Sequence, residues 1–394
     1  MKRANTIFAV ILLVMAWCGG CNQSSNRSDD LITVDVTANY PEKELILQDF
    51  MDVEYIALET TDEFVCQGIV FDVGKQMMIV RNQINDGNIF LFDRKGKGLR
   101  VINRWGQGPE EYTTISGITL DEDNGEIFVR EIAKGILVYD LYGNFSRRIP
   151  LNEDVSFSFL QNYDRDHLIC GESTFNADEK STESQLCTII SKKDGSIVNA
   201  IRMHFEKGVN TRVSPEGGNI NIVILLSAMV KAVLPYHDSW ILTELSSDTI
   251  FKLLPDLSMT PFMARTPSVH TMNPELFLLP VILTDRYYFL EMLKKEAERR
   301  PGFFPRTKLI FDRQEKAIYR YTLSNNDYTT PKPIELSIGL FSNINNEIAY
   351  LQKIEAYQLI ESNEKGELKG RLKEVAAELD NDSNPVIMLV KHRR

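Results

Sequence analysis

The sequence has no long basic run, and acidic residues outnumber basic ones. It contains 44 Lys and Arg against 55 Asp and Glu, which gives a formal net charge of −11. A protein that binds nucleic acid needs clustered Lys and Arg to replace the counterions of the phosphates. The charge and its distribution therefore argue against DNA or RNA as a partner.

Cysteine is scarce as well, and the short motifs of several catalytic sites are missing. Three of the five cysteines, Cys66, Cys170 and Cys187, lie beyond the N-terminal leader, and none has CxxC or Cys/His zinc spacing. A disulfide between Cys170 and Cys187 and a pair of buried thiols are both open alternatives. There is no GxSxG elbow, no HExxH helix and no GxxxxGK[ST] loop. The sequence therefore predicts no catalytic residue, no metal ligand set and no resident cofactor.

The N-terminal apolar run is too short to cross a bilayer, which takes about 20 residues. It extends from Ile7 to Trp17 and follows the basic pair Lys2-Arg3. A basic head before roughly 7 to 15 apolar residues is typical of a secretory signal. We therefore expect the chain to be exported.

The residues after this run resemble the lipobox of bacterial lipoproteins. They read Cys18-Gly19-Gly20-Cys21, followed by a polar stretch through Asp30. The resemblance implies cleavage before Cys21, which becomes the lipid-anchored residue, and makes residues 1–20 a signal peptide and 21–31 a flexible tether. Cys18 stands where Leu is usual, so a secreted soluble protein is the alternative. By analogy with Bacteroides-like lipoproteins, the pair Asp29-Asp30 behind the lipobox favours the outer membrane.

Short apolar-alternating runs separated by Asn, Asp and Gly turns recur from Leu31 onward, which is typical of strands and hairpins. Two units are nearly alike, and three weaker copies follow at intervals of roughly 45 to 65 residues, the size of a propeller blade. The first unit joins Gln76–Arg81 to Ile89–Asp93, and the second joins Glu126–Arg130 to Ile136–Asp140; the weaker copies are Leu186–Ser191, Thr249–Leu254 and Leu309–Asp312, the last followed by Ala317–Leu323.

This pattern predicts an all-β fold: a six-bladed β-propeller of four-stranded antiparallel blades over residues 32–394. Stacked blades bury faces that one small sheet leaves open. We expect Asn384–Lys391 to be the closing strand, with Ile32–Val36 and Val53–Leu58 sharing the last blade. The charged, Ala- and Leu-rich stretch Leu351–Leu379, interrupted near residues 363–366, predicts a short C-terminal helical insertion before that strand.

Two further segments are ambiguous between helix and strand. Arg286–Arg300 is aromatic in its first half and helix-prone in its second, and we expect a strand that leads into a charged loop or short helix. Asn219–Leu234 is strongly apolar but short for a membrane span, and we expect a buried strand pair or hairpin.

Several phrases resemble the six-bladed propeller lipoproteins of Bacteroides and relatives, a group related to NHL-type propellers. They are Val53–Thr61 with its LETT ending, Trp105–Tyr112, Ser247–Phe251 and Asn384-Pro385-Val386. Glu110 stands where a third glycine is common in the second phrase. The resemblance implies the fold and a periplasmic or cell-surface location, but no activity, because a fold hosts many functions.

The loop Gly106-Gln107-Gly108-Pro109 is the candidate ligand-binding site, since glycine lets a ligand approach the backbone closely. Its flanking residues add charge and two aromatic rings able to stack on a sugar. The candidate contacts are Arg104, Trp105, Gln107, Glu111 and Tyr112. The alternative is a blade-to-blade turn whose aromatic residues pack between sheets.

Metal binding has weaker support. The turns at residues 85–88 and 121–125 offer oxygen ligands for a structural or channel-bound Ca²⁺, but such clusters are ordinary in hairpin turns. The five histidines are far apart in sequence, with His204 and His270 the first to test.

The function predicted from these features is a lipid-anchored envelope propeller that binds or scaffolds a glycan, a peptide or a partner protein. Attachment to the membrane is through the N-terminal lipid. One alternative is a metal-dependent propeller enzyme of the lactonase or lyase type. Another is a structural subunit of an envelope complex.

Overall fold

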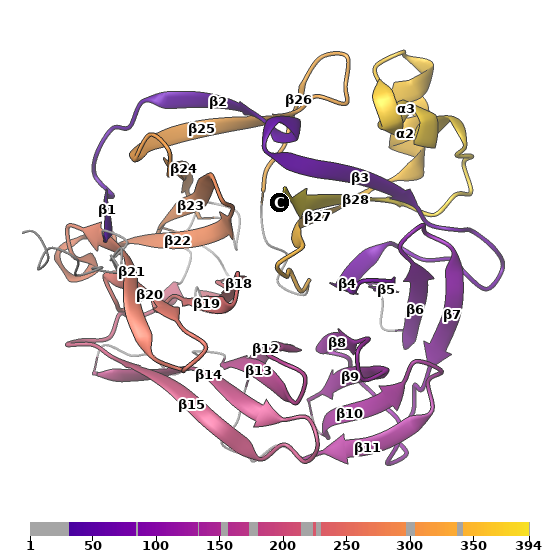
Figure 1. Ribbon diagram of the computed structural model, residues 1–394, viewed down its shortest axis with the longest axis horizontal. Helices are drawn as coiled ribbons and strands as arrows, with labels where there is room; N and C mark the ends of the chain where they lie inside the picture. Colours follow the sequence, from indigo (N-terminus) through magenta and orange to yellow (C-terminus); the bar gives the residue numbers. More distant parts are fainter. Residues whose placement is uncertain are drawn as a thin grey trace, which may run out of the picture.

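The computed structural model describes residues 31–83, 86–132, 134–150, 157–172, 180–213, 224–225, 230–296, 304–336 and 342–393. Six sheets of three or more strands stand around one central axis like the blades of a propeller (Figure 1). The predicted all-β, six-bladed propeller is thereby confirmed. The leader and Cys21 lie outside the described residues.

Blades 1 to 3 each consist of four consecutive antiparallel strands, numbered from the axis outward. The two most similar sequence units are the second and third strands of blades 1 and 2. Blade 1 contains β4 (Ile69–Val73), β5 (Met77–Arg81), β6 (Asn88–Asp93) and β7 (Gly98–Asn103); blade 2 contains β8 (Gly117–Asp121), β9 (Glu126–Glu131), β10 (Gly135–Asp140) and β11 (Phe145–Ile149); blade 3 contains β12 (Phe157–Asn162), β13 (His167–Glu172), β14 (Glu183–Ser191) and β15 (Ile197–His204).

Blades 4 and 5 also have four consecutive antiparallel strands, but each gains an outer, parallel strand from the N-terminal segment. Blade 4 contains β18 (Val233–Tyr236), β19 (Ser239–Leu242), β20 (Thr249–Leu253) and β21 (Met259–Thr266), with β1 (Ile32–Asp35) outside; blade 5 contains β22 (Leu276–Leu283), β23 (Tyr287–Lys294), β24 (Arg306–Asp312) and β25 (Ala317–Asn325), with β2 (Glu42–Ile46) outside and β26 (Lys332–Pro333) on the end of β25. The short strands β16 (Arg212–Val213) and β17 (Ile224–Leu225) pair with each other, and the 3₁₀ turns η1 (Leu47–Asp49) and η3 (Val269–Thr271) connect strands.

The two ambiguous segments both contain strands where the structure describes them. The first half of Arg286–Arg300 is β23, while residues 297–300 are outside the described part of the chain. Within Asn219–Leu234, β17 pairs with β16, not with β18, which begins at Val233.

The closing blade joins the two ends of the chain. It contains β27 (Ile348–Ile354), β28 (Val386–His392) and β3 (Met51–Ala57), and β28 pairs with β3 along its whole length, from Val386↔Ala57 to His392↔Met51. The expected sharing of this blade by Asn384–Lys391 and Val53–Leu58 is therefore confirmed. The blade has three strands where four were expected, and helix α3 (Gly370–Ala377) packs against the outer strand β3.

Two expectations about the ends of the chain are wrong. Ile32–Val36 does not join the closing blade but pairs with β21 of blade 4. The reason is that β3 already occupies the outer place beside β28, while β21 offers an unpaired outer edge that an extended strand can cover.

The second correction concerns Leu351–Leu379. Its first four residues complete β27, and helices begin only with α2 (Ala356–Glu364), followed after Gly366 by α3. The predicted helical insertion and its interruption are otherwise confirmed. None of the helices in the described ranges is long and apolar enough to cross a membrane.

Strand β6 shows why the middle strands of a blade are apolar at successive positions. Phe90 and Phe92 pack toward the closing blade, whereas Ile89 and Leu91 pack toward blade 2. All four side chains are buried. Because each blade is covered on both faces, an unbroken apolar run can form a strand here.

The burial of both faces of a blade also shows whether Cys170 and Cys187 form a disulfide or remain buried thiols. Cys170 on β13 packs in the cluster between blades 2 and 3, and Cys187 on β14 packs in the cluster toward blade 4. Both carry thiols and are fully buried. Their side chains lie on opposite faces of blade 3, so they form no disulfide with each other.

A tight turn between the third and outer strands fixes the spacing of neighbouring blades. In blade 1 the carboxylate of Asp93 accepts hydrogen bonds from the backbone N–H of Lys95 and Lys97, and Gly96 adopts φ +88°. A Cβ on Gly96 would lie 2.0 Å from the carbonyl oxygen of Ala57 in the closing blade. Glycine is therefore required both for the positive φ and for this close approach.

Candidate functional site

The candidate loop predicted from glycine content lies between β7 and β8, where it closes on itself. A bridge joins Trp105 to Tyr112. The Tyr112 ring is fully buried, and its hydroxyl donates to Gly87 O at 2.8 Å and accepts from Arg104 N at 3.0 Å. Burial also raises the pKa of Tyr112 to about 12. Tyr112 therefore packs between blades, which is one of the two alternatives that the sequence left open, and it offers no ring face for stacking on a sugar.

The glycines of this loop accommodate Glu111. The Glu111 carboxylate accepts from Gly108 N at 2.8 Å, and a Cβ on Gly106 would lie 2.0 Å from the same carboxylate. Lys134 donates to the carbonyl oxygens of both Gly108 and Glu111. In this structure the glycines make room for a side chain of the protein itself.

The other candidate contacts remain at the surface. Arg104 Nε donates to Gly143 O of blade 2 at 2.8 Å, which holds its guanidinium against the protein. Trp105 is 42% exposed and Gln107 is exposed. Among the candidate contacts, Trp105 and Gln107 thus remain exposed, while the guanidinium of Arg104 is bonded to blade 2.

The carboxylates of the proposed calcium turns are engaged by the protein. Asp121 is buried and pairs with Lys192 Nζ at 2.6 Å, and it also accepts from Asn124 Nδ2 at 2.8 Å. Asp86 accepts from Asn82 and from the backbone of Asn88. These contacts are those of hairpin turns and a buried ion pair between blades 2 and 3.

The histidines selected from the sequence lie in separate places. His204 Nδ1 is 3.2 Å from Glu183 at the exposed outer edge of blade 3, and His270 Nε2 is 3.1 Å from Ser246 O beside blade 4. Across the described residues, no three His, Cys, Asp or Glu side chains gather closely enough to hold a metal ion.

The axis of the propeller is crossed by a segment that we call the axial segment, Ser342–Asn346, which leads into β27 (Figure 1). Its Asn343 donates through Nδ2 to Ile118 O and Leu160 O, at 3.3 and 3.2 Å, and through its backbone to Phe71 O at 2.8 Å. One residue thereby connects the inner strands of blades 1, 2 and 3.

Two ionisable groups lie beside the axial segment. Asp72 is buried, and burial raises its pKa to about 6 although Leu120 N and Val73 N both donate to its carboxylate. Burial lowers the pKa of Lys231 to about 8, and its Nζ donates to Ser342 O. This polar cluster joins the segment before β18 of blade 4 to blades 1, 2 and 3 across the axis.

A large groove lies where the ring closes, and we call it the closure groove. It has a volume of about 830 Å³, within the range of ligand pockets. Its walls come from three places far apart in sequence: the connection from β3 to β4, the β6–β7 turn, and the segment between α3 and β28. The lining residues are Ala57–Asp62, Val65, Lys95–Lys97, Glu378–Asp380, Asp382 and Ser383.

Asn384 holds two walls of the closure groove together. Its Nδ2 donates to Glu59 O at 2.8 Å and to Phe64 O at 2.6 Å, and its Oδ1 accepts from Cys66 N at 2.8 Å. The adjacent Pro385 packs against Gly68, where a Cβ would lie 3.0 Å away. The LETT and Asn-Pro phrases of the sequence therefore meet here.

The closure groove is acidic with an apolar part. Carboxylates line it from both ends of the chain, at Glu59, Asp62, Glu378, Asp380 and Asp382, against the two amines of Lys95 and Lys97. Val65 is 62% exposed at its edge, although apolar. Sequence reasoning missed this site because its residues come together only through the pairing of β3 with β28.

The family comparison agrees with the architecture. A profile of the protein family described as "6-bladed beta-propeller" (DUF5128) matches residues 22–339. This match covers most of the chain and ends before β27, α2, α3 and β28. No curated protein matches the sequence.

Two solved structures are similar to this chain in fold. A crystal structure described as a "Putative exported protein" from Bacteroides fragilis NCTC 9343 has a TM-score of 0.56 at 14% sequence identity, covering 92% of this chain and 99% of that chain. A member of the DUF4221 family from Bacteroides vulgatus ATCC 8482 has a TM-score of 0.48 at 10% identity, covering 88% of this chain and 99% of that one. At such low identity the first of these supports the fold alone.

Proposed function

Because the chain belongs to the six-bladed β-propeller family DUF5128, we propose that it is a lipid-anchored binding protein of the cell envelope that holds a basic polypeptide segment in the closure groove. The observation that carries this proposal is the groove itself, with its volume of about 830 Å³ and its excess of carboxylates. A propeller presents such a site on a rigid ring, which limits the ordering cost of binding.

The anchor part of the proposal rests on the N-terminal sequence. The apolar run before Cys18-Gly19-Gly20-Cys21 supports export and acylation of Cys21. The name of the Bacteroides fragilis structure is in keeping with export. The first described residue, Leu31, directly precedes β1 on the outer edge of blade 4, so a tether from Cys21 would attach at the rim of the ring. We favour the outer membrane, with the propeller facing the periplasm or the cell surface.

The ligand class follows from the lining of the groove. Carboxylates attract Lys and Arg side chains, and complementary charge both speeds association and disfavours anionic partners. The exposed Val65 and the half-buried Leu379 add apolar area suited to a polypeptide. An anionic glycan would meet like charge at most of the rim.

The test is a binding titration on the soluble form that begins at Asn22, which keeps every described element. We expect a Lys-rich peptide containing Val and Leu to bind and raise the Tm, because a ligand of the folded state stabilises it. Binding should weaken with salt, since exposed charges are screened. An acidic peptide of the same length and a neutral oligosaccharide serve as comparisons, and tighter binding of either would overturn the proposed ligand class.

The matched variants remove charge without removing hydrogen bonds. We choose Asp62→Asn, Glu378→Gln and Asp382→Asn together, because Asp380 and Glu59 accept hydrogen bonds that shape the groove. The control carries Asp238→Asn, Glu364→Gln and Glu367→Gln, three exposed carboxylates outside the groove lining. We expect the first set to weaken peptide binding at least about tenfold, or 1.4 kcal/mol, and the control to leave it unchanged. Equal binding by both sets would contradict the assignment of this groove.

A further inference from the structure

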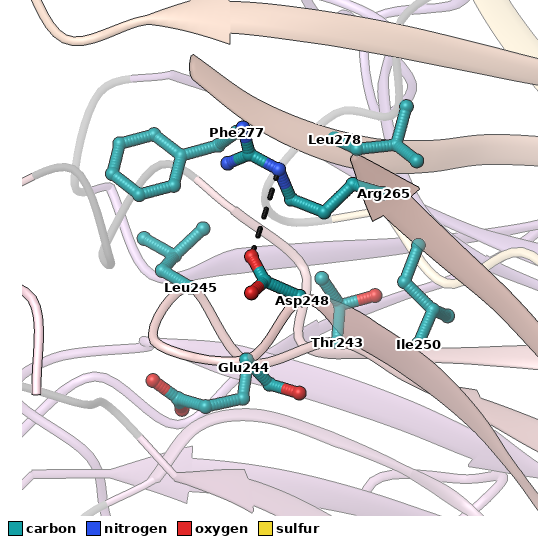
Figure 2. A pocket seen from close by; sticks show the side chains of 9 residues that line it. Thr243, Glu244, Leu245, Asp248, Ile250, Arg265, Phe277 and Leu278 are labelled. Atoms are coloured by element: carbon teal, nitrogen blue, oxygen red, sulfur yellow. Dashed lines mark ion pairs between the residues drawn. The ribbon is translucent and has the colours of Figure 1, made fainter. Parts of the chain in front are cut away.

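A second, much smaller cavity lies between the outer part of blade 4 and the start of blade 5. The centre of a water-sized sphere can occupy a volume of about 10 Å³ inside this cavity. Figure 2 shows its walls: Thr243 and Leu245 from the β19–β20 loop, Asp248 before β20, Arg265 on β21, and Phe277 on β22. The space suits one small molecule, because a single water needs roughly 10 to 15 Å³ by this measure.

Two buried polar atoms on these walls have no hydrogen-bond partner among the described residues. They are Arg265 Nε and Thr243 Oγ1. The Arg265 side chain is 3% exposed, and Thr243 is buried. An unsatisfied buried donor or hydroxyl destabilises the folded state, so such atoms normally have a partner.

The ion pair across the cavity is too long to be a direct hydrogen bond. Arg265 Nε lies 3.7 Å from Asp248 Oδ1, and Figure 2 shows the two groups pointing toward each other. The Asp248 carboxylate is fixed by Val269 N, which donates to it at 2.7 Å. A polar separation beyond 3.5 Å with space beside it is typical of a water-mediated contact.

The chemistry of the walls restricts the occupant. The guanidinium of Arg265 disfavours a cation, and the carboxylate of Asp248 disfavours an anion. A neutral molecule that donates to Asp248 and accepts from Arg265 fits both. We propose that this cavity is the binding site of one structural water molecule, which bridges Arg265 Nε, Asp248 Oδ1 and Thr243 Oγ1.

The other contacts of Arg265 indicate which part of the fold this water would stabilise. Arg265 Nη1 donates to Leu276 O at the start of β22, and Arg265 N donates to Asp248 O at 2.8 Å. Arg265 thus joins β21 of blade 4 to β22, the inner strand of blade 5. The water would give a partner to Nε, the buried nitrogen of this guanidinium that has none among the described residues, and so would stabilise the junction of the two blades.

The substitution Thr243→Val is expected to change the Tm in opposite directions in a hydrated cavity and in an empty one. In a dry cavity, Thr243→Val removes an unsatisfied hydroxyl and raises the Tm of the soluble form beginning at Asn22. In a hydrated cavity the same change removes a partner of the water and lowers the Tm. The matched control is Thr119→Val, whose buried hydroxyl donates to Leu160 O at 2.8 Å and whose loss lowers the Tm in either case.

A crystal structure of the same form completes the test. We expect one density peak within about 3.2 Å of Arg265 Nε and Thr243 Oγ1 in the parent protein, and its loss in Thr243→Val. An empty cavity, direct pairing of Arg265 with Asp248, or a Tm that rises in Thr243→Val would each overturn the proposal.

Discussion

At the scale of single residues, Asp72 gives the fold a specific dependence on pH. Burial raises the pKa of its carboxyl to about 6, above its ordinary value of 3.8. The carboxyl therefore favours the folded state most below pH 4, and this contribution is lost as the pH rises through 6. Between these pH values, the contribution of Asp72 to the free energy of unfolding falls by at most about 3 kcal/mol.

We predict that Asp72→Asn removes this dependence. The free energy of unfolding of the parent, measured relative to the variant by urea denaturation, should fall between pH 4.5 and pH 7.5. Asp123→Asn, at an exposed carboxylate of the β8–β9 turn, serves as the control and should give a constant difference. Parallel pH profiles for the parent and Asp72→Asn would contradict the prediction.

Two glycines allow the energetic cost of backbone strain to be distinguished from the cost of a close contact. Gly96 and Gly125 both have positive φ, +88° and +69°, but a Cβ would meet the backbone of Ala57 at the first and nothing within 4 Å at the second. We predict that Gly125→Ala costs about 1 kcal/mol, and that Gly96→Ala costs about 1 to 3 kcal/mol more because the closing blade must move. Equal losses in urea denaturation would show that the contact with Ala57 is easily relaxed.

At the scale of elements, the N-terminal strands cover sheet edges. Strand β1 pairs with β21 and β2 with β25, so the outermost strands of blades 4 and 5 are not left open. An uncovered edge presents unpaired N–H and C=O groups to other chains. The N-terminal segment therefore contributes to solubility as well as to stability.

We predict that a soluble form beginning at Pro41, which lacks β1, folds but self-associates. The exposed edge of β21 would pair with other molecules, and light scattering during gel filtration should report a mass that rises with concentration. A form beginning at Leu31, which keeps β1, is the control and should stay at one mass. If both forms behave alike, the edge of β21 is protected by other means.

Much of this organisation could be predicted from the sequence, because blade strands and their turns are local features. The run Ile89–Asp93 indicates a strand, and Lys95-Gly96 indicates a turn, without knowledge of the rest of the chain. The place of Ile32–Val36 could not be predicted, because a parallel partner on blade 4 leaves no mark in its own sequence. The role of Tyr112 stayed open for a related reason: an aromatic residue beside glycines is compatible with both packing and binding until its burial is known.

The closure groove could not be predicted from the sequence either. Asp62 and Asp382 lie near opposite ends of the sequence, so their shared wall depends on the pairing of β28 with β3. Asn343 was overlooked because an asparagine in a loop has no special signal. Its three blade contacts exist only after the ring has formed.

At the scale of the whole molecule, the proposed anchor predicts a single decisive residue. We expect the full chain to fractionate with membranes and to carry the mass of a lipid, and Cys21→Ser to lose both properties. Three acyl chains bind a membrane far more firmly than one, since each buried CH₂ adds about 0.8 kcal/mol. Cys18→Ser is the control and should remain attached; a soluble parent protein would instead favour cleavage as an ordinary secreted protein.

The pairing of β3 with β28 also sets the order of events during biosynthesis. Strand β3 is made early and its partner β28 lies far downstream, so all the other blades must emerge before the two can meet. Such a distant contact forms slowly and late, because a long loop must be closed first. A ribosome or a translocation channel that still holds β28 therefore keeps the ring open, and the chain stays threadable until β28 has emerged.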